Sequence, residues 1–189
     1  MRPALLILLL SKKFTHYAFH FIFFLSKGPD YLQKNNLLEE KDILPRGWKV
    51  SFKIIPTDIV KDWSSILHAT QGGDFENDGD CTPAVWFKPN SLKPFICSSV
   101  NGDKYYCYTF PDLPFYKVAT IRIQQIQSTS NHRYYYEIYI NKNKVQRQIN
   151  KEPHSFKNVK YYASDPFYEP AKAKFDDFEL TTFKHVDYE

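Results

Sequence analysis

The stretch WSSILHATQGGDFENDGDCTPAVWF, residues 63–87, indicates the architecture of the whole chain. Two apolar runs with the composition of strands, residues 65–69 and 83–87, flank a polar loop. Oxygen-bearing side chains are concentrated in that loop: Asp74, Glu76, Asn77, Asp78 and Asp80. Because so many like charges are unfavourable without water or a cation to neutralise them, the loop is the first candidate for a functional site.

The strand pattern continues on both sides of this stretch. Residues 48–54 alternate apolar and polar side chains, which predicts a half-buried strand that ends at Pro56. Residues 118–126 and 134–140 alternate in the same way, and Asn101-Gly102 is the strongest hairpin signal in the chain. In the second of these runs, the side chains predicted to point inward are Tyr136, Ile138 and Ile140.

The spacing of these runs predicts the fold class. About ten to twelve short strands recur at intervals of roughly 8–12 residues, no long window has helical periodicity, and 189 residues suit one domain. The 16 Phe and 14 Tyr residues also favour sheet over helix. We therefore expect an all-β domain over residues 29–189, with two antiparallel sheets packed face to face.

Residues 1–28 form a distinct leader. They contain Arg2, Lys12, Lys13 and Lys27, no acidic residue, and two apolar runs. This pattern predicts a signal peptide or a signal anchor, and hence a secreted or extracellular protein that touches a membrane only through an uncleaved leader. An internal hydrophobic element or a wrongly assigned start is the alternative. Without the leader, 21 basic residues balance 21 acidic ones, so nothing favours nucleic-acid binding.

The three cysteines, Cys81, Cys97 and Cys107, lack the spacing of a metal site. A hairpin with a three-residue loop at 101–103 would place Cys97 opposite Cys107, whereas a loop changed by one residue would place Cys97 opposite Tyr106. Three reduced, mostly buried thiols are the other interpretation.

Several motifs, in this order, resemble the concanavalin A-like lectin/glucanase superfamily, and most closely its laminin-G-like extracellular animal domains. These motifs are WKVSFKIIP (48–56), WSSILH (63–68), Gly72-Gly73-Asp74, Gly79-Asp80, TPAVWF (82–87) and VKYYASDP (159–166). The resemblance covers about residues 37–183. It implies a jelly-roll sandwich and a binding module for glycan or protein, with ligands or calcium at the sheet rim or on the concave face. Relatives usually carry a basic residue where this chain has Cys81.

The acidic loop is the candidate calcium site. Asp74, Glu76, Asp78 and Asp80 provide carboxylates, and Gly79 provides the turn glycine of a calcium loop. The helix-loop-helix form of such a site fails because Val85 stands where a bidentate Glu belongs. A solvated acidic turn is the alternative, and the adjoining His68 is interpreted as a surface or edge residue rather than a ligand.

A second candidate site is predicted on an outward sheet face. Tyr135 and Tyr139 flank Glu137 on one side of their strand, and Arg122 and Gln124 are expected on a neighbouring strand. Aromatic rings beside hydrogen-bonding groups suit a sugar, because sugar C–H faces stack on rings while hydroxyls need polar partners. Cross-strand pairing of outward tyrosines is the structural alternative.

The sequence offers little for catalysis. Glycosidases of this fold use paired carboxylates on a strand, and the nearest candidate, residues 176–179, has the wrong spacing. We therefore expect a non-catalytic extracellular recognition module with calcium as a possible cofactor. A hydrolase acting on polysaccharide and a purely structural adhesion domain are the alternatives.

Overall fold

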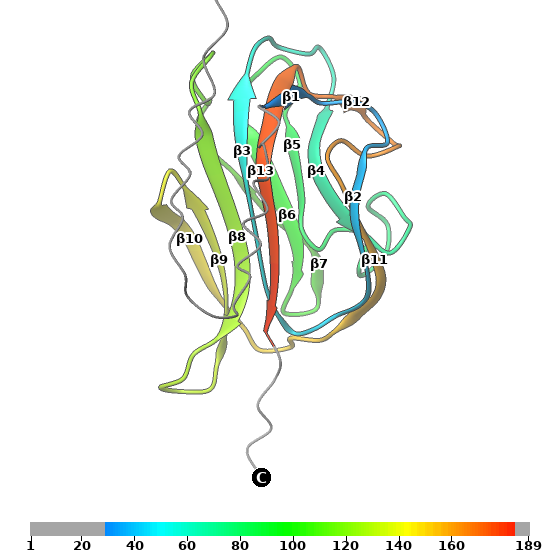
Figure 1. Cartoon of the computed structure of the whole chain (residues 1–189). Helices are drawn as coiled ribbons and strands as arrows, with labels where there is room; N and C mark the ends of the chain where they lie inside the picture. Colours follow the sequence, from blue (N-terminus) through cyan, green and yellow to red (C-terminus); the bar gives the residue numbers. More distant parts are fainter. Residues whose placement is uncertain (1–28, 184–189) are drawn as a thin grey trace, which may run out of the picture.

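The computed structural model describes residues 29–183. This part of the chain is all β, and its strands form two antiparallel sheets packed face to face (Figure 1). The all-β sandwich predicted from strand spacing is therefore confirmed. None of the described residues forms a helix long and apolar enough to cross a membrane. The predicted leader, residues 1–28, lies outside the described residues.

Sheet A contains six strands in the order β1-β13-β3-β8-β9-β10. Their bounds are β1 Asp30–Tyr31, β13 Ala173–Phe183, β3 Gly47–Pro56, β8 Ala119–Gln127, β9 Tyr134–Ile140 and β10 Asn143–Asn150. Sheet B contains β2-β11-β4-β5-β6-β7, and the short β12 pairs with β4 in parallel. Their bounds are β2 Leu37–Leu44, β11 Phe156–Tyr162, β4 Ser64–Thr70, β5 Ala84–Phe87, β6 Pro94–Val100, β7 Asp103–Thr109 and β12 Glu169–Pro170.

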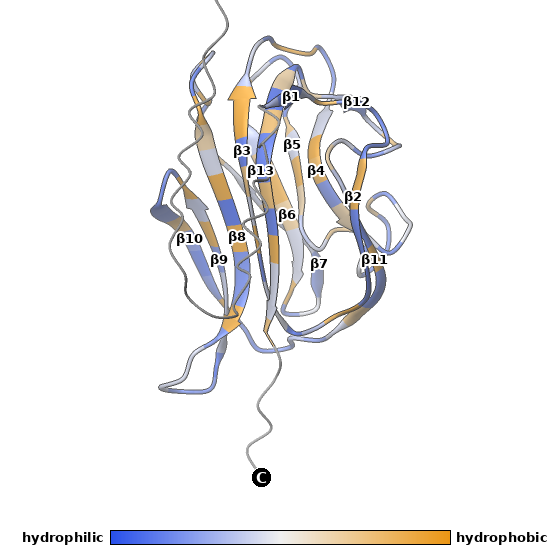
Figure 2. Ribbon diagram, in the orientation of Figure 1, coloured by the Kyte–Doolittle hydropathy of each residue, from blue (hydrophilic) through white to orange (hydrophobic). Residues whose placement is uncertain are grey.

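The hydrophobic core lies between the two sheets. Trp48, Val50, Phe52 and Ile54 of β3 are buried as the alternation predicts, and Figure 2 shows apolar and polar residues alternating along β3 and β8. The predicted inward side of β9 is confirmed as well, with Tyr136 and Ile138 fully buried and Ile140 packed against the core. The side chains between these positions consequently form the outer face of sheet A.

Sheet B differs because its central strands β4 and β5 are buried on both faces. Val85 and Phe87 of β5 belong to the main core, whereas Ala84 and Trp86 belong to a second, separate apolar cluster. Since neighbouring strand residues point to opposite faces, this second cluster lies on the outer face of sheet B.

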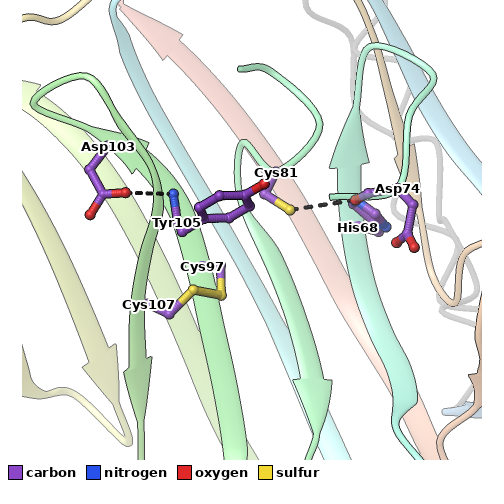
Figure 3. Close-up of a disulfide and its surroundings, with 7 residues drawn as sticks. All are labelled: His68, Asp74, Cys81, Cys97, Asp103, Tyr105 and Cys107. Carbon is purple, nitrogen blue, oxygen red and sulfur yellow. Dashed lines mark hydrogen bonds between the residues drawn. A yellow bond between two sulfur atoms is a disulfide. The ribbon is translucent and has the colours of Figure 1, made fainter. Parts of the chain in front are cut away.

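A disulfide joins Cys97 of β6 to Cys107 of β7, while Cys81 is a buried free thiol (Figure 3). The hairpin loop is not the three-residue loop expected from the sequence. It consists of Asn101 and Gly102 alone, both with positive φ, and Val100 pairs with Asp103. A register shift between Ser98 and Val100 then restores the pairing of Cys97 with Cys107.

Removing this disulfide is expected to destabilise the domain moderately. The cysteines are 10 positions apart, so closing so short a loop limits the entropic gain to about 2–3 kcal/mol. For a domain of this size, we expect the melting temperature of a Cys97→Ala/Cys107→Ala variant to fall by roughly 5–10 °C. Differential scanning calorimetry with and without a reducing agent measures this. The reductant should lower the melting temperature of the parent protein but not that of the variant, and equal shifts in both would contradict the assignment.

Candidate functional site

The predicted sugar-binding residues meet on the outer face of sheet A, but they are bound to one another. The Glu137 carboxylate lies at the centre and accepts hydrogen bonds from Gln124 Nε2 (2.8 Å), Tyr139 Oη (2.7 Å) and Lys144 Nζ (2.7 Å). Arg147 Nε is 3.1 Å from the same carboxylate. Burial raises the pKa of Glu137, but the hydrogen bonds outweigh this effect and hold the pKa below its usual value. The Glu137 carboxylate is therefore charged, and its oxygens are occupied by neighbouring side chains.

Guanidinium groups lie over the two outward tyrosine rings. The Arg122 guanidinium carbon is 3.8 Å from the Tyr139 ring centre, and that of Arg147 is 3.9 Å from the Tyr135 ring centre. Such stacking is favourable because the cation faces the negative side of the ring. One face of each tyrosine is thus already in contact with an arginine, which limits sugar stacking at these rings.

The four carboxylates of the acidic loop contact different partners. Asp80 accepts hydrogen bonds from the backbone N–H groups of Glu76 (3.0 Å) and Asn77 (2.6 Å), and so fixes the turn. Asp74 Oδ2 accepts a hydrogen bond from Tyr168 Oη (3.1 Å). Asp78 lies 2.8 Å from His154 Nε2, and the side chain of Glu76 is exposed. Over residues 29–183, no three His, Cys, Asp or Glu side chains converge in a way that would hold a metal ion.

The arrangement of the loop therefore does not fit calcium, which needs six to eight oxygen ligands around one point. We expect millimolar calcium to leave the melting temperature unchanged and to release no heat on titration. Isothermal titration calorimetry and thermal unfolding with calcium or with chelator test this. Because a bound ion stabilises the native state, a rise of several degrees in calcium would show that the loop rearranges around the ion.

His68 is not the surface or edge residue expected from the sequence. It lies on β4, inside sheet B, and is fully buried. Its Nδ1 atom is 2.9 Å from Asp165 Oδ2, and its Nε2 atom is 2.6 Å from the backbone oxygen of Asp80. Because the backbone oxygen of Asp80 can only accept, Nε2 donates to it, while Nδ1 lies against the Asp165 carboxyl group. We call His68, Asp80 and Asp165 the buried polar network.

The network connects two loops that are far apart in sequence. Asp165 Oδ1 accepts hydrogen bonds from the backbone N–H groups of Phe167 (2.9 Å) and Tyr168 (2.8 Å), while His68 binds the end of the acidic loop at Asp80. Burial raises the pKa of Asp165, but hydrogen bonds from His68 and from the backbone outweigh it and keep the pKa below its usual value. The charge on Asp165 is therefore part of the native fold.

Cys81 lies near this network, with Sγ 3.9 Å from His68 Nε2 and 3.7 Å from the backbone oxygen of Asp74 (Figure 3). A cysteine, a histidine and an aspartate are the components of a nucleophilic site. Here, however, burial and the surrounding carboxylates raise the pKa of the Cys81 thiol far above its usual value. A thiolate is the reactive form, so these groups do not form an activated nucleophile.

Five aromatic side chains line a pocket above the network, on the outer face of sheet B: Trp63, Phe75, Trp86, Phe95 and Tyr168. Trp86 is central, with ring centres 5.8 Å from Phe75, 5.8 Å from Tyr168 and 6.4 Å from Phe95. The pocket has a volume of about 220 Å³. We call these five residues the aromatic pocket.

Polar atoms adjoin the aromatic pocket. The ammonium of Lys88 lies 5.9 Å from the ring centre of Trp63 and 5.5 Å from that of Phe95. Trp86 Nε1 and Asp74 Oδ1 are buried and have no hydrogen-bond partner in the described chain. Burial raises the pKa of Asp74, although the hydrogen bond from Tyr168 opposes the rise. The pocket thus combines stacking surfaces with one unmatched donor on Trp86, and an unmatched acceptor lies on Asp74, which is hydrogen-bonded to the wall residue Tyr168.

The sequence analysis missed the aromatic pocket. One signal was available, because Ala84-Val-Trp-Phe87 is apolar at every position, which is typical of a strand covered on both faces. The wall residues gave no such signal. Phe75 lies among acidic residues and Tyr168 lies in a turn, and both reach the pocket only through the tertiary fold.

Comparison with known proteins identifies the fold. No family model matches the sequence, and no curated protein matches it. Among solved structures, a CBM40 module of Ruminococcus gnavus IT-sialidase, bound to α2,3-sialyllactose, aligns with a TM-score of 0.51 at 11% identity, over 85% of this chain and 95% of that one. Mouse laminin α1 domains LG4-5 align with a TM-score of 0.52 at 10% identity, over 80% of this chain and 43% of that one. A SAP-like pentraxin from Limulus polyphemus aligns with a TM-score of 0.50 at 12% identity, over 80% and 73%.

Proposed function

From the concanavalin A-like jelly-roll fold that this chain shares with those structures, we propose that it is a non-catalytic recognition module that binds glycan in the aromatic pocket. The observation that carries the proposal is the convergence of five aromatic rings on one face of sheet B. Aromatic rings provide flat apolar surfaces that stack on the C–H faces of a sugar.

The size of the pocket limits what enters it. Drug-sized ligands occupy pockets of roughly 300–1,000 Å³, whereas this one measures about 220 Å³. It therefore suits a single ring, such as the end of a glycan chain. A sugar hydroxyl both donates and accepts hydrogen bonds. It could therefore accept a hydrogen bond from Trp86 Nε1 and donate one to Asp74 Oδ1, which have no partner in the described chain. Both atoms are covered, so a small shift of a wall side chain accompanies such contacts.

The geometry near the pocket supports recognition rather than hydrolysis. Asp74 and Asp80 of the acidic loop bind Tyr168 and backbone N–H groups. The side chains of Cys81 and His68 are buried, so neither is accessible to a substrate. A glycosidase needs two accessible carboxylates about 5–10 Å apart.

A glycan array tests the proposed function. We expect the parent chain to bind a defined subset of glycans, and the Trp63→Ala variant to lose that binding because Trp63 is a half-buried wall of the pocket. Bound glycans should be recovered intact, without release of reducing sugar. Binding that is unchanged in Trp63→Ala would place the ligand elsewhere, and cleaved glycans would show a hydrolase.

We further propose that the protein acts outside the cell. The Cys97–Cys107 disulfide supports this, because such bonds persist in oxidising compartments. Expression of the 189-residue chain with a C-terminal tag in animal cells tests it, since the tagged protein should be recovered from the medium. Recovery from the cell lysate alone, with three titratable thiols, would contradict it.

A further inference from the structure

We propose that the outer face of sheet A binds an anionic polysaccharide, one bearing sulfate or carboxylate groups. The basic side chains that carry this inference are Lys49 on β3, Arg122 on β8, and Lys144 and Arg147 on β10. We call these four residues the basic face. It lies on the opposite sheet from the aromatic pocket, so the two sites are independent.

Strand register brings the basic face together. Lys49 pairs with Gln124, Gln124 with Glu137, and Glu137 with Arg147, which makes one row across four strands. The neighbouring row runs from Ser51 through Arg122 and Tyr139 to Lys144. Residues that pair in register lie on the same face of a sheet. Residues 49, 122, 144 and 147 therefore share one surface, about 15 Å wide from β3 to β10 at the usual strand spacing.

The charges of this surface do not balance. Glu137 lies within the two rows and is shared between Lys144 and Arg147. Glu179 of β13 extends the second row beyond Ser51, whose hydroxyl donates a hydrogen bond to it (3.4 Å). Across the described part of the chain, neither Lys49 nor Arg122 has an ion pair, in contrast to the nearby Lys53, which pairs with Asp177. Four cations against the two carboxylates of Glu137 and Glu179 leave an excess of two positive charges, which attracts an anionic ligand.

Arg122 is already held in position for binding. Its guanidinium lies 3.8 Å from the Tyr139 ring centre, its Nε atom is buried, and that atom has no hydrogen-bond partner. A long side chain that is fixed before binding loses less conformational freedom when a ligand arrives. A planar guanidinium also matches the paired oxygens of a carboxylate or a sulfate.

The shape of the surface favours a polysaccharide over a membrane. The guanidinium carbons of Arg122 and Arg147 lie 3.8 and 3.9 Å from the ring centres of Tyr139 and Tyr135, so both groups are held against the rings. Proteins that lie on membranes insert apolar or aromatic side chains between the lipid headgroups. Among the described residues, none of the large exposed hydrophobic side chains comes from β3, β8, β9 or β10. A polar and positively charged sheet face suits an extended polyanion.

Binding to dextran sulfate tests the inference, with neutral dextran as the matched probe. We expect the 189-residue chain to bind dextran sulfate, to ignore neutral dextran, and to bind more weakly as salt is raised, because salt screens exposed charges. The Lys49→Gln/Arg122→Gln variant should bind at least about tenfold more weakly, which corresponds to one lost charged hydrogen bond. The ion pairs of Glu137 with Lys144 and Arg147 remain in this variant, so we expect the fold to persist. Circular dichroism of the variant and the parent chain checks this.

The control removes the same charge from the other sheet. Lys157 and Lys160 on β11 are both exposed, and the Lys157→Gln/Lys160→Gln variant should bind dextran sulfate like the parent chain. Equal losses in both variants would show a net-charge effect and overturn the inference, as would the absence of dextran sulfate binding. Polygalacturonate binding in addition would extend the site to carboxylates. Binding to phosphatidylserine vesicles but not to dextran sulfate would overturn the inference and indicate that the basic face binds a lipid surface.

Discussion

Replacing His68 with leucine is expected to lower the free energy of unfolding by about 3–5 kcal/mol, which is the usual cost of leaving a buried charged group without its partner. Leucine leaves the buried Asp165 carboxylate without its hydrogen bond from His68 and the Asp80 carbonyl without its donor. Urea unfolding monitored by tryptophan fluorescence measures the change. We also expect the aromatic pocket to loosen, because His68 joins the two loops that carry Phe75 and Tyr168.

A second histidine provides the matched control. His154 lies 2.8 Å from Asp78 in an ion pair whose side chains are 43% and 53% exposed. Exposed pairs contribute little, so His154→Leu should change the stability by less than about 1 kcal/mol. Similar losses in the two variants would indicate that the buried polar network has no special role.

The pH dependence of the His68→Leu effect provides an independent check. In the parent chain the pKa of Asp165 is below its usual value, so this group stabilises the fold above its unfolded-state pKa, and that contribution is lost as the pH falls through the native pKa. Without His68, burial dominates and the pKa of Asp165 should rise. The variant then gains stability relative to the parent as the pH is lowered from 7 towards 4. A stability difference that stays constant over this range would contradict the assigned ion pair.

Trp63→Ala is expected to weaken glycan binding by at least about 30-fold, because aromatic anchors in pockets typically contribute 2 kcal/mol or more. Trp63 is only half-buried and lies just before β4, which begins at Ser64, so its loss should affect binding more than folding. Isothermal titration calorimetry with the glycan selected by the array measures the change.

Two further variants separate stacking from general effects. Trp63→Phe keeps a ring in the wall and should retain most of the affinity. Tyr116→Ala removes an aromatic side chain that is 73% exposed and does not line the pocket, so the affinity should be unchanged. If Trp63→Ala and Tyr116→Ala weakened binding equally, the pocket would not be the binding site.

The sandwich could be predicted from the sequence because its strands follow simple rules. In β3, apolar and polar side chains alternate from Trp48 to Ile54, and the buried positions are the apolar ones. Asn101-Gly102 marked the hairpin correctly, but the bulge after Ser98, which sets the cysteine pairing, has no sequence signal. Bulges depend on tertiary packing as much as on local sequence.

The candidate sites were harder to predict, for two physical reasons. His68 lies in SSILHAT, whose seven residues are all buried, so the alternation that distinguishes inside from outside is absent there. Its partner Asp165 is 97 positions away, and such long-range contacts leave no local pattern. The group around Tyr135 and Tyr139 was predicted to share a face, which the register confirms, but the arginines stacked on the rings depend on side-chain conformations that spacing does not determine.

The position of β13 has a consequence for how the protein is made. This strand lies between β1 and β3, so residues from the C-terminal part of the described chain occupy the interior of sheet A. During synthesis, β3 has an unpaired edge until residues 173–183 emerge from the ribosome. Pairing between segments so distant in sequence is slow, and open edges invite contacts with other chains. We therefore expect the nascent chain to be most prone to contacts with other chains before β13 pairs with β3.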